Sequence, residues 1–270
     1  MNYRVGSVPY LNAKPLVKPF DWRGSASPVE VAYDVPSRLP ALLEADQVQA
    51  VMVSSIEALR TPGAKVAAGL SIGTRREVLS VRLFSKVPPS QISSVAEDAS
   101  SMTSNALARI VLTERYKVEP YWEPAAPSLE DMLAAHDACV MIGDNGMRAD
   151  GEGLHVLDLG REWLALTGLP FVWALWVGGD ALVPELVAHL QAARREGIDR
   201  LKQVIAEASA ETGFTQAECR RYLAEIMDYG FDEEQQAGLR EFGLRCERHG
   251  LIAKSHYPEI VEPAAVSAKS

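Results

Sequence analysis

Three places along the sequence put short polar side chains where a predicted strand gives way to a helix. Asn12 follows the first strand, Ser54 and Ser55 follow a later one, and Thr103 and Ser104 open a helix further on. Backbone N–H groups at a helix start lack partners and the helix dipole is positive there, so such positions bind anions. Ligands of open α/β sheets also lie beyond the carboxyl ends of strands. Ser and Thr are equally ordinary helix caps, so two interpretations remain: an anion site, or separate caps.

Candidate acids and bases are few. Asp144 places a carboxylate directly after a predicted buried strand, although a turn-forming aspartate has the same pattern. His136 and His155 are possible general bases, but surface histidines of this kind are usually only solvated. Three tryptophans are typical of packing in a core or between lobes rather than of a stacking platform: Trp163, Trp173 and Trp176.

No pattern in the sequence predicts a metal site or an organic cofactor. The five histidines have no metal-ligand spacing, and the three cysteines form no Cys-x-x-Cys pair. An odd number of widely spaced cysteines is typical of reduced thiols in a cytosolic protein. We therefore expect chemistry that needs neither metal nor cofactor.

The charge and hydropathy of the chain limit the classes of partner that it can bind. A formal net charge of -9 argues against nonspecific nucleic-acid binding, which requires a cationic surface. No apolar run approaches the roughly 20 residues that span a bilayer. The first seven residues lack the basic and apolar regions of a signal peptide. We expect a cytoplasmic protein with no nucleic-acid or membrane partner, and no pattern sets an oligomeric state.

Strand-like and helix-like segments alternate through the first two thirds of the chain, which predicts an α/β fold with parallel strands. The predicted strands are residues 3–7, 50–53, 78–85, 95–96, 138–142, 156–159 and 171–177. Ser37 is predicted to cap a short helix, and Ser128 and Thr215 begin capping boxes. From Ala181 onward the pattern predicts helices only, with Gly250 ending the last one. Because no linker is apparent, we expect two lobes joined by extended segments at 81–86 and 171–177.

Three segments together resemble the chorismate dehydratase family (MqnA) of the futalosine route to menaquinone. They are VPYLNAKPL at residues 8–16, VMVSSIE at 51–57, and DLG through TGLPFVWALW at 158–176. The short matches LSV at 79–81 and IGD at 142–144 lie between them. The resemblance covers nearly all of residues 3–177, whereas the helical C-terminal part carries no diagnostic motif.

The resemblance implies a type II periplasmic-binding-protein fold that closes on its substrate. One lobe would contain residues 1–83 and 178–270, and the other residues 84–177. The implied activity is that of a hydro-lyase, which converts chorismate into 3-[(1-carboxyvinyl)oxy]benzoate by loss of water and without a cofactor.

Within that reaction we expect Asn12 and Ser80 to hold the substrate's own enolpyruvyl carboxylate where it can take the ring proton. Positioning of this kind supplies rate enhancement without a protein base. The expected substrate-binding residues around them are Ser7, Tyr10, Ser54, Ser55, Thr103, Ser104 and Asp144.

Three alternatives stay open at this level. The sibling 1,4-dihydroxy-6-naphthoate synthase (MqnD) shares the fold, but its N-terminal loop pattern differs from Pro9–Asn12. A solute-binding protein for small anions is a common use of this fold, but a transporter receptor would need export or a lipid anchor. A ligand-sensing regulator would need a helix-turn-helix segment before the first strand.

Overall fold

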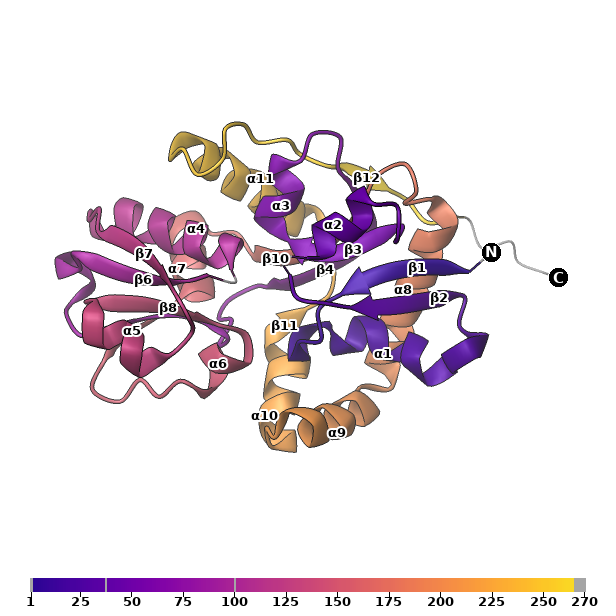
Figure 1. Cartoon of the computed structure of the whole chain (residues 1–270), viewed down its shortest axis with the longest axis horizontal. Helices are drawn as coiled ribbons and strands as arrows, with labels where there is room; N and C mark the ends of the chain where they lie inside the picture. Colours follow the sequence, from indigo (N-terminus) through magenta and orange to yellow (C-terminus); the bar gives the residue numbers. More distant parts are fainter. Residues whose placement is uncertain (1, 37, 100, 265–270) are drawn as a thin grey trace.

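The structure is a computed structural model that describes residues 2–36, 38–99 and 101–264. The predicted cap Ser37 lies outside the described residues. Figure 1 shows two α/β units side by side, each built around its own sheet.

The first unit contains a sheet of seven strands. In sheet order these are β11 (Met227–Asp228), β4 (Lys65–Thr74), β10 (Phe171–Gly178), β3 (Ala50–Ser54), β1 (Tyr3–Ser7) and β2 (Val29–Tyr33), with β12 (Glu259–Val261) paired to β4. Its helices are α1 (Lys14–Arg23), α2 (Leu39–Glu44), α3 (Ser55–Arg60), α8 (Pro184–Asp199), α9 (Leu201–Thr212), α10 (Gln216–Arg220) and α11 (Glu233–Arg248). Short 3-10 turns η1 (Leu11–Ala13) and η2 (Gly24–Ala26) and the π-helical segment η5 (Arg221–Ile226) complete it.

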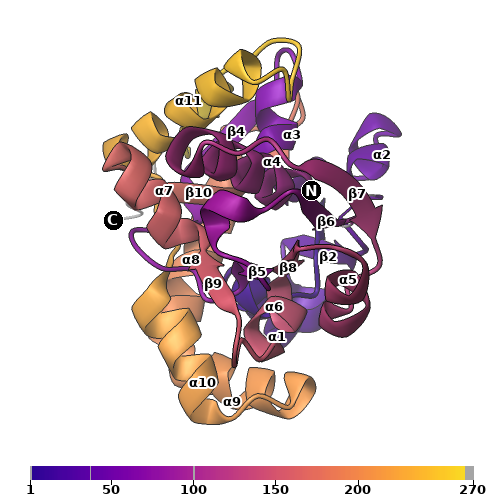
Figure 2. The same ribbon diagram turned by 90° about the vertical axis from the view of Figure 1, so that its left-hand side faces the viewer.

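The second unit contains a sheet of five strands. In order these are β7 (Tyr121–Ala125), β6 (Ser94–Asp98), β8 (Ala138–Ile142), β5 (Val81–Ser85) and β9 (His155–Asp158). Its helices are α4 (Met102–Val111), α5 (Leu129–Ala135), α6 (Gly143–Arg148) and α7 (Leu159–Thr167), with the 3-10 turn η3 (Pro89–Gln91) and the π-helical segment η4 (Leu112–Tyr116). Viewed from this unit, α4 and α7 lie on one side of the sheet and α5 and α6 on the other (Figure 2).

Both sheets are mixed rather than purely parallel. Pairs β1–β2, β1–β3, β6–β7 and β6–β8 are parallel, as the alternating pattern predicts. In contrast, β10 is antiparallel to β3 and β4, and β5 is antiparallel to β8 and β9. Each of these two is the first strand that the chain forms after crossing from the other unit. It therefore runs away from the junction, whereas the parallel strands run toward it.

The sheets show where the chain crosses between the units. The segments predicted to cross, 81–86 and 171–177, are instead mostly strands β5 and β10 within the sheets. The crossing segments are the short connections at 75–80 and 168–170, because each lies between elements of different units. The lobe boundaries expected after residues 83 and 177 fall within those strands. We therefore propose boundaries near residues 80 and 170, which keep each strand in its own sheet.

Local signals in the C-terminal part act largely as the sequence predicts. Thr215 and Glu218 form a reciprocal capping box at α10, and Ser128 accepts the N–H of Asp131 at α5. Gly250 follows α11 with a φ of 66°, which a glycine adopts without strain. The expectation of helices only is wrong, because β11 and β12 both pair with β4. Strands of two and three residues are too short to show an alternating pattern.

Large apolar side chains fill the space under the first sheet and continue toward α4 and α7. Trp163 and Trp176 are fully buried, and the rings of Trp163, Phe171 and Phe242 pack edge to face. Each such side chain contributes about 1.5–3 kcal/mol by leaving water. Among the described residues, no helix combines the length and apolar character needed to cross a bilayer.

Candidate functional site

A cavity of about 380 Å³ lies where the two units meet. Its lining combines Met52 and Trp173 of the first sheet with Thr103 of α4 and Ile142 of β8. This volume is within the range of small-molecule sites, which are mostly apolar with a few placed polar groups. The cavity at the junction of the units is therefore large enough for a small ligand.

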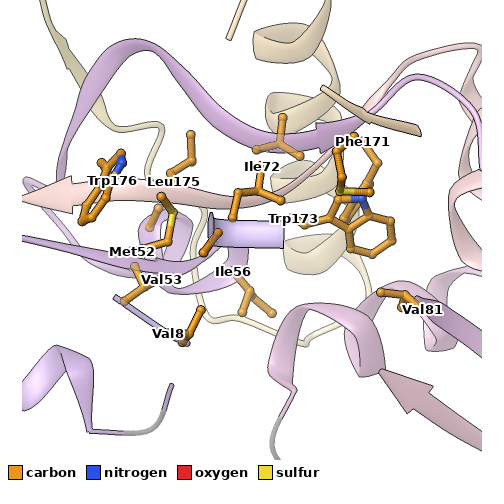
Figure 3. Close-up of a cluster of buried hydrophobic side chains, with 14 of the residues drawn as sticks. Val8, Met52, Val53, Ile56, Ile72, Val81, Phe171, Trp173, Leu175 and Trp176 are labelled. Carbon is orange, nitrogen blue, oxygen red and sulfur yellow. The ribbon is translucent and has the colours of Figure 1, made fainter. Parts of the chain in front are cut away.

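The first sheet supplies the apolar wall of the cavity. Figure 3 shows Val8, Met52, Val53, Ile72 and Trp173 together, and all five line the cavity. The Trp173 indole N–H donates to Thr74 Oγ1 at 3.1 Å, which satisfies its polar atom within the protein. Its ring is thus a fixed surface. Such a wall suits the planar part of a ligand.

Asn12 and Ser80 are brought together on the polar side. Asn12 lies in η1, the first turn after β1, Ser80 directly precedes β5, and both line the cavity. The Tyr222 hydroxyl donates to Ser80 Oγ at 2.7 Å, and the Asn12 side chain also hydrogen-bonds the phenol. The Asn12 Oδ1 atom is buried without a partner among the described residues. The two residues that the sequence singles out thus line one cavity, whereas the sequence gives no sign of Tyr222.

The start of α4 supplies a second group of donors. Ser101 caps this helix by accepting the N–H of Ser104, and Ser101, Thr103 and Ser104 all line the cavity. Thr103 Oγ1 accepts the N–H of Ile56 at 3.0 Å, which joins α4 to α3 across the two units. The first turn of α4 therefore presents hydroxyls and a positive dipole end to the cavity.

One ion pair borders the cavity. Glu57 and Arg60 both line it, and Arg60 Nη2 lies 2.7 Å from Glu57 Oε2. Among the described lining residues these are the only carboxylate and the only cation. No pattern in the sequence gives either residue a role. Their spacing of three residues puts both on one face of α3, and only the position of that face identifies them.

Comparison with known proteins places the chain in a family. A family model described as menaquinone biosynthesis matches residues 3–248. The chain belongs to the menaquinone biosynthesis family. A chorismate dehydratase of Thermus thermophilus is 30% identical over 278 residues, covering 95% of this chain and 99% of that protein. A chorismate dehydratase of Campylobacter jejuni is 26% identical over 254 residues, covering 91% and 98%.

This member of the menaquinone biosynthesis family has the fold of periplasmic binding proteins. The aliphatic sulphonate binding protein SsuA of Escherichia coli superposes with a TM-score of 0.70 at 13% identity, covering 100% of this chain and 94% of that one. At this identity the likeness concerns the fold alone. It confirms the α/β architecture with two sheets that the sequence resemblance implies.

Most of the expected binding residues do line the cavity. Besides Asn12, Ser80 and the α4 residues, these are Tyr10 and Ser54. Tyr10 is half-buried, and burial raises its pKa, with Asp98 and Asp144 adding to the effect. Its phenol thus stays protonated. Ser54 precedes α3 without capping a backbone N–H of that helix.

Three expected residues do not line the cavity: Ser7, Ser55 and Asp144. The buried Ser7 hydroxyl donates to Val8 O at 3.3 Å, and Ser55 Oγ donates to Val172 O at 2.5 Å. The Ser7 bond is local to the end of β1, whereas the Ser55 bond ties the start of α3 to β10. Both bonds use the hydroxyls within the protein, so a contact with a ligand is not supported for either.

Asp144 joins the units instead of lining the cavity. Burial raises the pKa of its carboxyl group, while Arg148, Lys14 and the backbone N–H of Leu11 act in the opposite direction. Leu11 belongs to η1 of the first unit and Asp144 to α6 of the second. The strand-end position of Asp144 is thus as predicted, but its partners are protein groups.

The alternative general bases from the sequence lie elsewhere. His136 faces Met132 O at 3.2 Å and Glu123 at 3.4 Å, and His155 is exposed on β9. Neither lines the cavity. In the described part of the chain, no group of three or more His, Cys, Asp or Glu side chains is arranged to hold a metal ion.

Proposed function

We propose that the protein is a chorismate dehydratase, a hydro-lyase that works in the cytoplasm and needs no cofactor. The observation that carries the proposal is the position of Asn12 and Ser80. In a member of the menaquinone biosynthesis family, both line the cavity and share the phenol of Tyr222. The two chorismate dehydratase relatives support this choice of reaction.

The reaction removes one water from chorismate. The ring C3–H bond breaks, the C4–O bond breaks, and a C3–C4 double bond completes the aromatic ring of 3-[(1-carboxyvinyl)oxy]benzoate. The C3 proton is vinylogous to the ring carboxylate, so its loss moves negative charge onto that carboxylate. Donors placed in advance around the carboxylate stabilise the developing charge.

The cavity offers polar groups in two places for the two carboxylates of chorismate. We assign the ring carboxylate to the start of α4, where Ser101, Thr103 and Ser104 border the cavity. Arg60 adds the only positive charge among the described lining residues. The enolpyruvyl carboxylate is assigned to Asn12 and Ser80. The apolar wall around Trp173 would then support the ring.

The enolpyruvyl carboxylate is the proposed base. No histidine lines the cavity in the described part of the chain, and the one lining carboxylate, Glu57, is already paired with Arg60. A carboxylate within the substrate avoids the cost of bringing a separate base into position. Asn12 and Ser80 would then act by holding this carboxylate against the C3 proton.

Incubation of purified protein with chorismate, followed by product analysis, tests the proposed function. We expect 3-[(1-carboxyvinyl)oxy]benzoate to accumulate, and chelator-treated protein to remain as active. Binding without turnover would instead support a small-anion binding protein. A requirement for one divalent metal would also contradict the mechanism.

Three variants separate the substrate base from a protein base. Asn12→Ala and Ser80→Ala should lower kcat more than they raise KM, because they remove contacts needed mainly in the transition state. Glu57→Gln should keep substantial kcat and act chiefly on KM, through its partner Arg60. If Glu57→Gln abolishes turnover while the protein still binds product, Glu57 is the base and the substrate-assisted mechanism is wrong.

A further inference from the structure

A buried tyrosine from the C-terminal part of the chain connects the two principal site residues. Tyr222 is 2% exposed and lies in the π-helical segment η5. Its hydroxyl donates to Ser80 Oγ at 2.7 Å, across 142 positions of sequence, and its oxygen is bonded by the Asn12 side chain. π-Helical turns are rare and frequently occur at functional sites.

We infer that Tyr222 is a positioning residue, which fixes the directions in which Ser80 and Asn12 present their hydrogen-bond donors and acceptors to the cavity. The inference rests on the proposed function, since it concerns how these two residues hold the substrate carboxylate and hydroxyl.

The direction follows from counting protons. A phenol has one proton, and Tyr222 gives it to Ser80 Oγ. The proton of Ser80 must then point to another acceptor, and Ser80 lines the cavity. The Asn12 amide donates to the phenol oxygen, which leaves its Oδ1 atom without a partner among the described residues. The network thus leaves two donors, the Ser80 hydroxyl and the second N–H of the Asn12 amide, and one acceptor, Asn12 Oδ1.

Such a set of groups matches the substrate chemistry. The Ser80 hydroxyl and the remaining Asn12 N–H suit the oxygens of the enolpyruvyl carboxylate, and the Asn12 acceptor suits a donor such as the C4 hydroxyl that leaves as water. Without the phenol, the Ser80 hydroxyl would rotate freely and the Asn12 amide would lose its partner. Burial raises the pKa of Tyr222, so the phenol keeps its proton and the network keeps its direction.

A second tyrosine provides a matched control. Tyr229 is 3% exposed and lies only seven positions after Tyr222 in the sequence. Its hydroxyl has no partner among the described residues, and Tyr229 does not line the cavity. Tyr222→Phe and Tyr229→Phe each remove one buried hydroxyl and retain the ring. A difference in activity between them therefore reports the network and not the loss of a buried phenol.

The experiment measures kcat and KM on chorismate for both variants, with thermal melting to confirm folding. We expect Tyr222→Phe to lower kcat about 10-fold or more while KM changes less than about 3-fold, since orientation matters most in the transition state. Tyr229→Phe should leave both within about 2-fold of the original protein. Unchanged kcat in Tyr222→Phe would overturn the inference, as would equal losses in the two variants.

A double variant tests the route of the effect. Because Tyr222 acts partly through Ser80, Tyr222→Phe should lower kcat by a clearly smaller factor in Ser80→Ala than in the original protein. Losses that multiply would show an independent, structural contribution and would contradict a positioning role. If the unmodified protein gives no product from chorismate, the proposed function fails and the inference fails with it. Full activity of Tyr222→Phe in an active enzyme defeats the inference alone.

Discussion

The carboxylate of Asp158 accepts the backbone N–H of Leu79 at 2.8 Å, and Leu79 has a left-handed φ of 59°. The same carboxylate accepts the N–H of Val78 at 3.0 Å and that of Arg161 at 3.1 Å. One side chain therefore caps α7 and fixes the turn before Ser80. A non-glycine residue in this conformation costs on the order of 1 kcal/mol or more, so the turn needs such support.

Replacing Asp158 should consequently harm catalysis as well as stability. We expect Asp158→Ala to lose at least the roughly 1 kcal/mol of a helix cap and to lower kcat, because Ser80 follows the released turn. Ser128→Ala is the matched control, since Ser128 caps α5 without touching the crossing segment. It should lose similar stability and keep its kcat. Denaturant unfolding and steady-state kinetics of both variants check this, and equal kcat values would contradict it.

Gly146 should be equally sensitive for a steric reason. A Cβ atom there would lie 2.3 Å from the carbonyl oxygen of Ser80 and 2.9 Å from that of Met141. Backbone atoms cannot yield as a flexible side chain does, so Gly146→Ala should displace Ser80 and reduce kcat by about 10-fold or more. A Cβ atom at Gly179 meets nothing within 4 Å, so Gly179→Ala should be neutral. Full activity in Gly146→Ala would show that Ser80 tolerates displacement.

Arg148 should help hold the two units together over the ligand. Its guanidinium donates to Thr212 O and stacks on the Phe214 ring at 4.2 Å, so α6 of the second unit is joined to the end of α9. We expect Arg148→Ala to raise KM about 3- to 10-fold with a smaller change in kcat, because it weakens the closed arrangement. Arg109→Ala is the control, since Arg109 contacts Glu97 and Trp122 within the second unit. Similar KM values in both variants would contradict a closing role.

The pH profile of turnover should lack a histidine limb. None of the described lining residues is a histidine, and burial raises the pKa of both lining tyrosines, Tyr10 and Tyr222. The phenols therefore stay protonated while the substrate carboxylate stays ionised, so kcat should be constant from about pH 6 to 9. Measuring kcat across that range checks this. A limb with a midpoint near the ordinary histidine pKa of about 6.5 would require a protein base.

The sequence predicts the parts of the site that depend on one local rule. Asn12, Ser54 and Thr103 follow from the rule that ligands lie beyond strand ends. Tyr222 could not be found this way, because its role depends on a contact across 142 positions. Strand β4 was not predicted, since its sequence is rich in Ala and Gly, which have low strand propensity. Gly69 within it has a φ of 68°, which interrupts any regular pattern.

Stability at acid pH should depend on Asp137, which lies between β6 and β8. Its carboxylate accepts the N–H of Ser93 at 2.9 Å and also the Ser93 hydroxyl, and these hydrogen bonds lower its pKa. Because the folded value lies below the unfolded value of about 3.9, the unfolded chain takes up the proton first as pH falls. The contribution of Asp137 is therefore present at neutral pH and is lost as pH falls through about 4 toward the folded value.

Asp137→Asn tests this linkage. The variant should be less stable than the original protein at pH 7, and the difference between them should shrink as pH falls below about 4. Glu44→Gln serves as the control, since Glu44 is exposed and makes no hydrogen bond or ion pair with the residues that the structure describes. It should show a small difference that does not depend on pH. Urea unfolding of the three proteins at several pH values measures the free energies. A lowered folded pKa and a pH-dependent stability are the same quantity. A stability difference for Asp137→Asn that stays constant well below about pH 4 would therefore contradict the prediction. It would show that the Ser93 hydrogen bonds do not stabilise the ionised carboxylate.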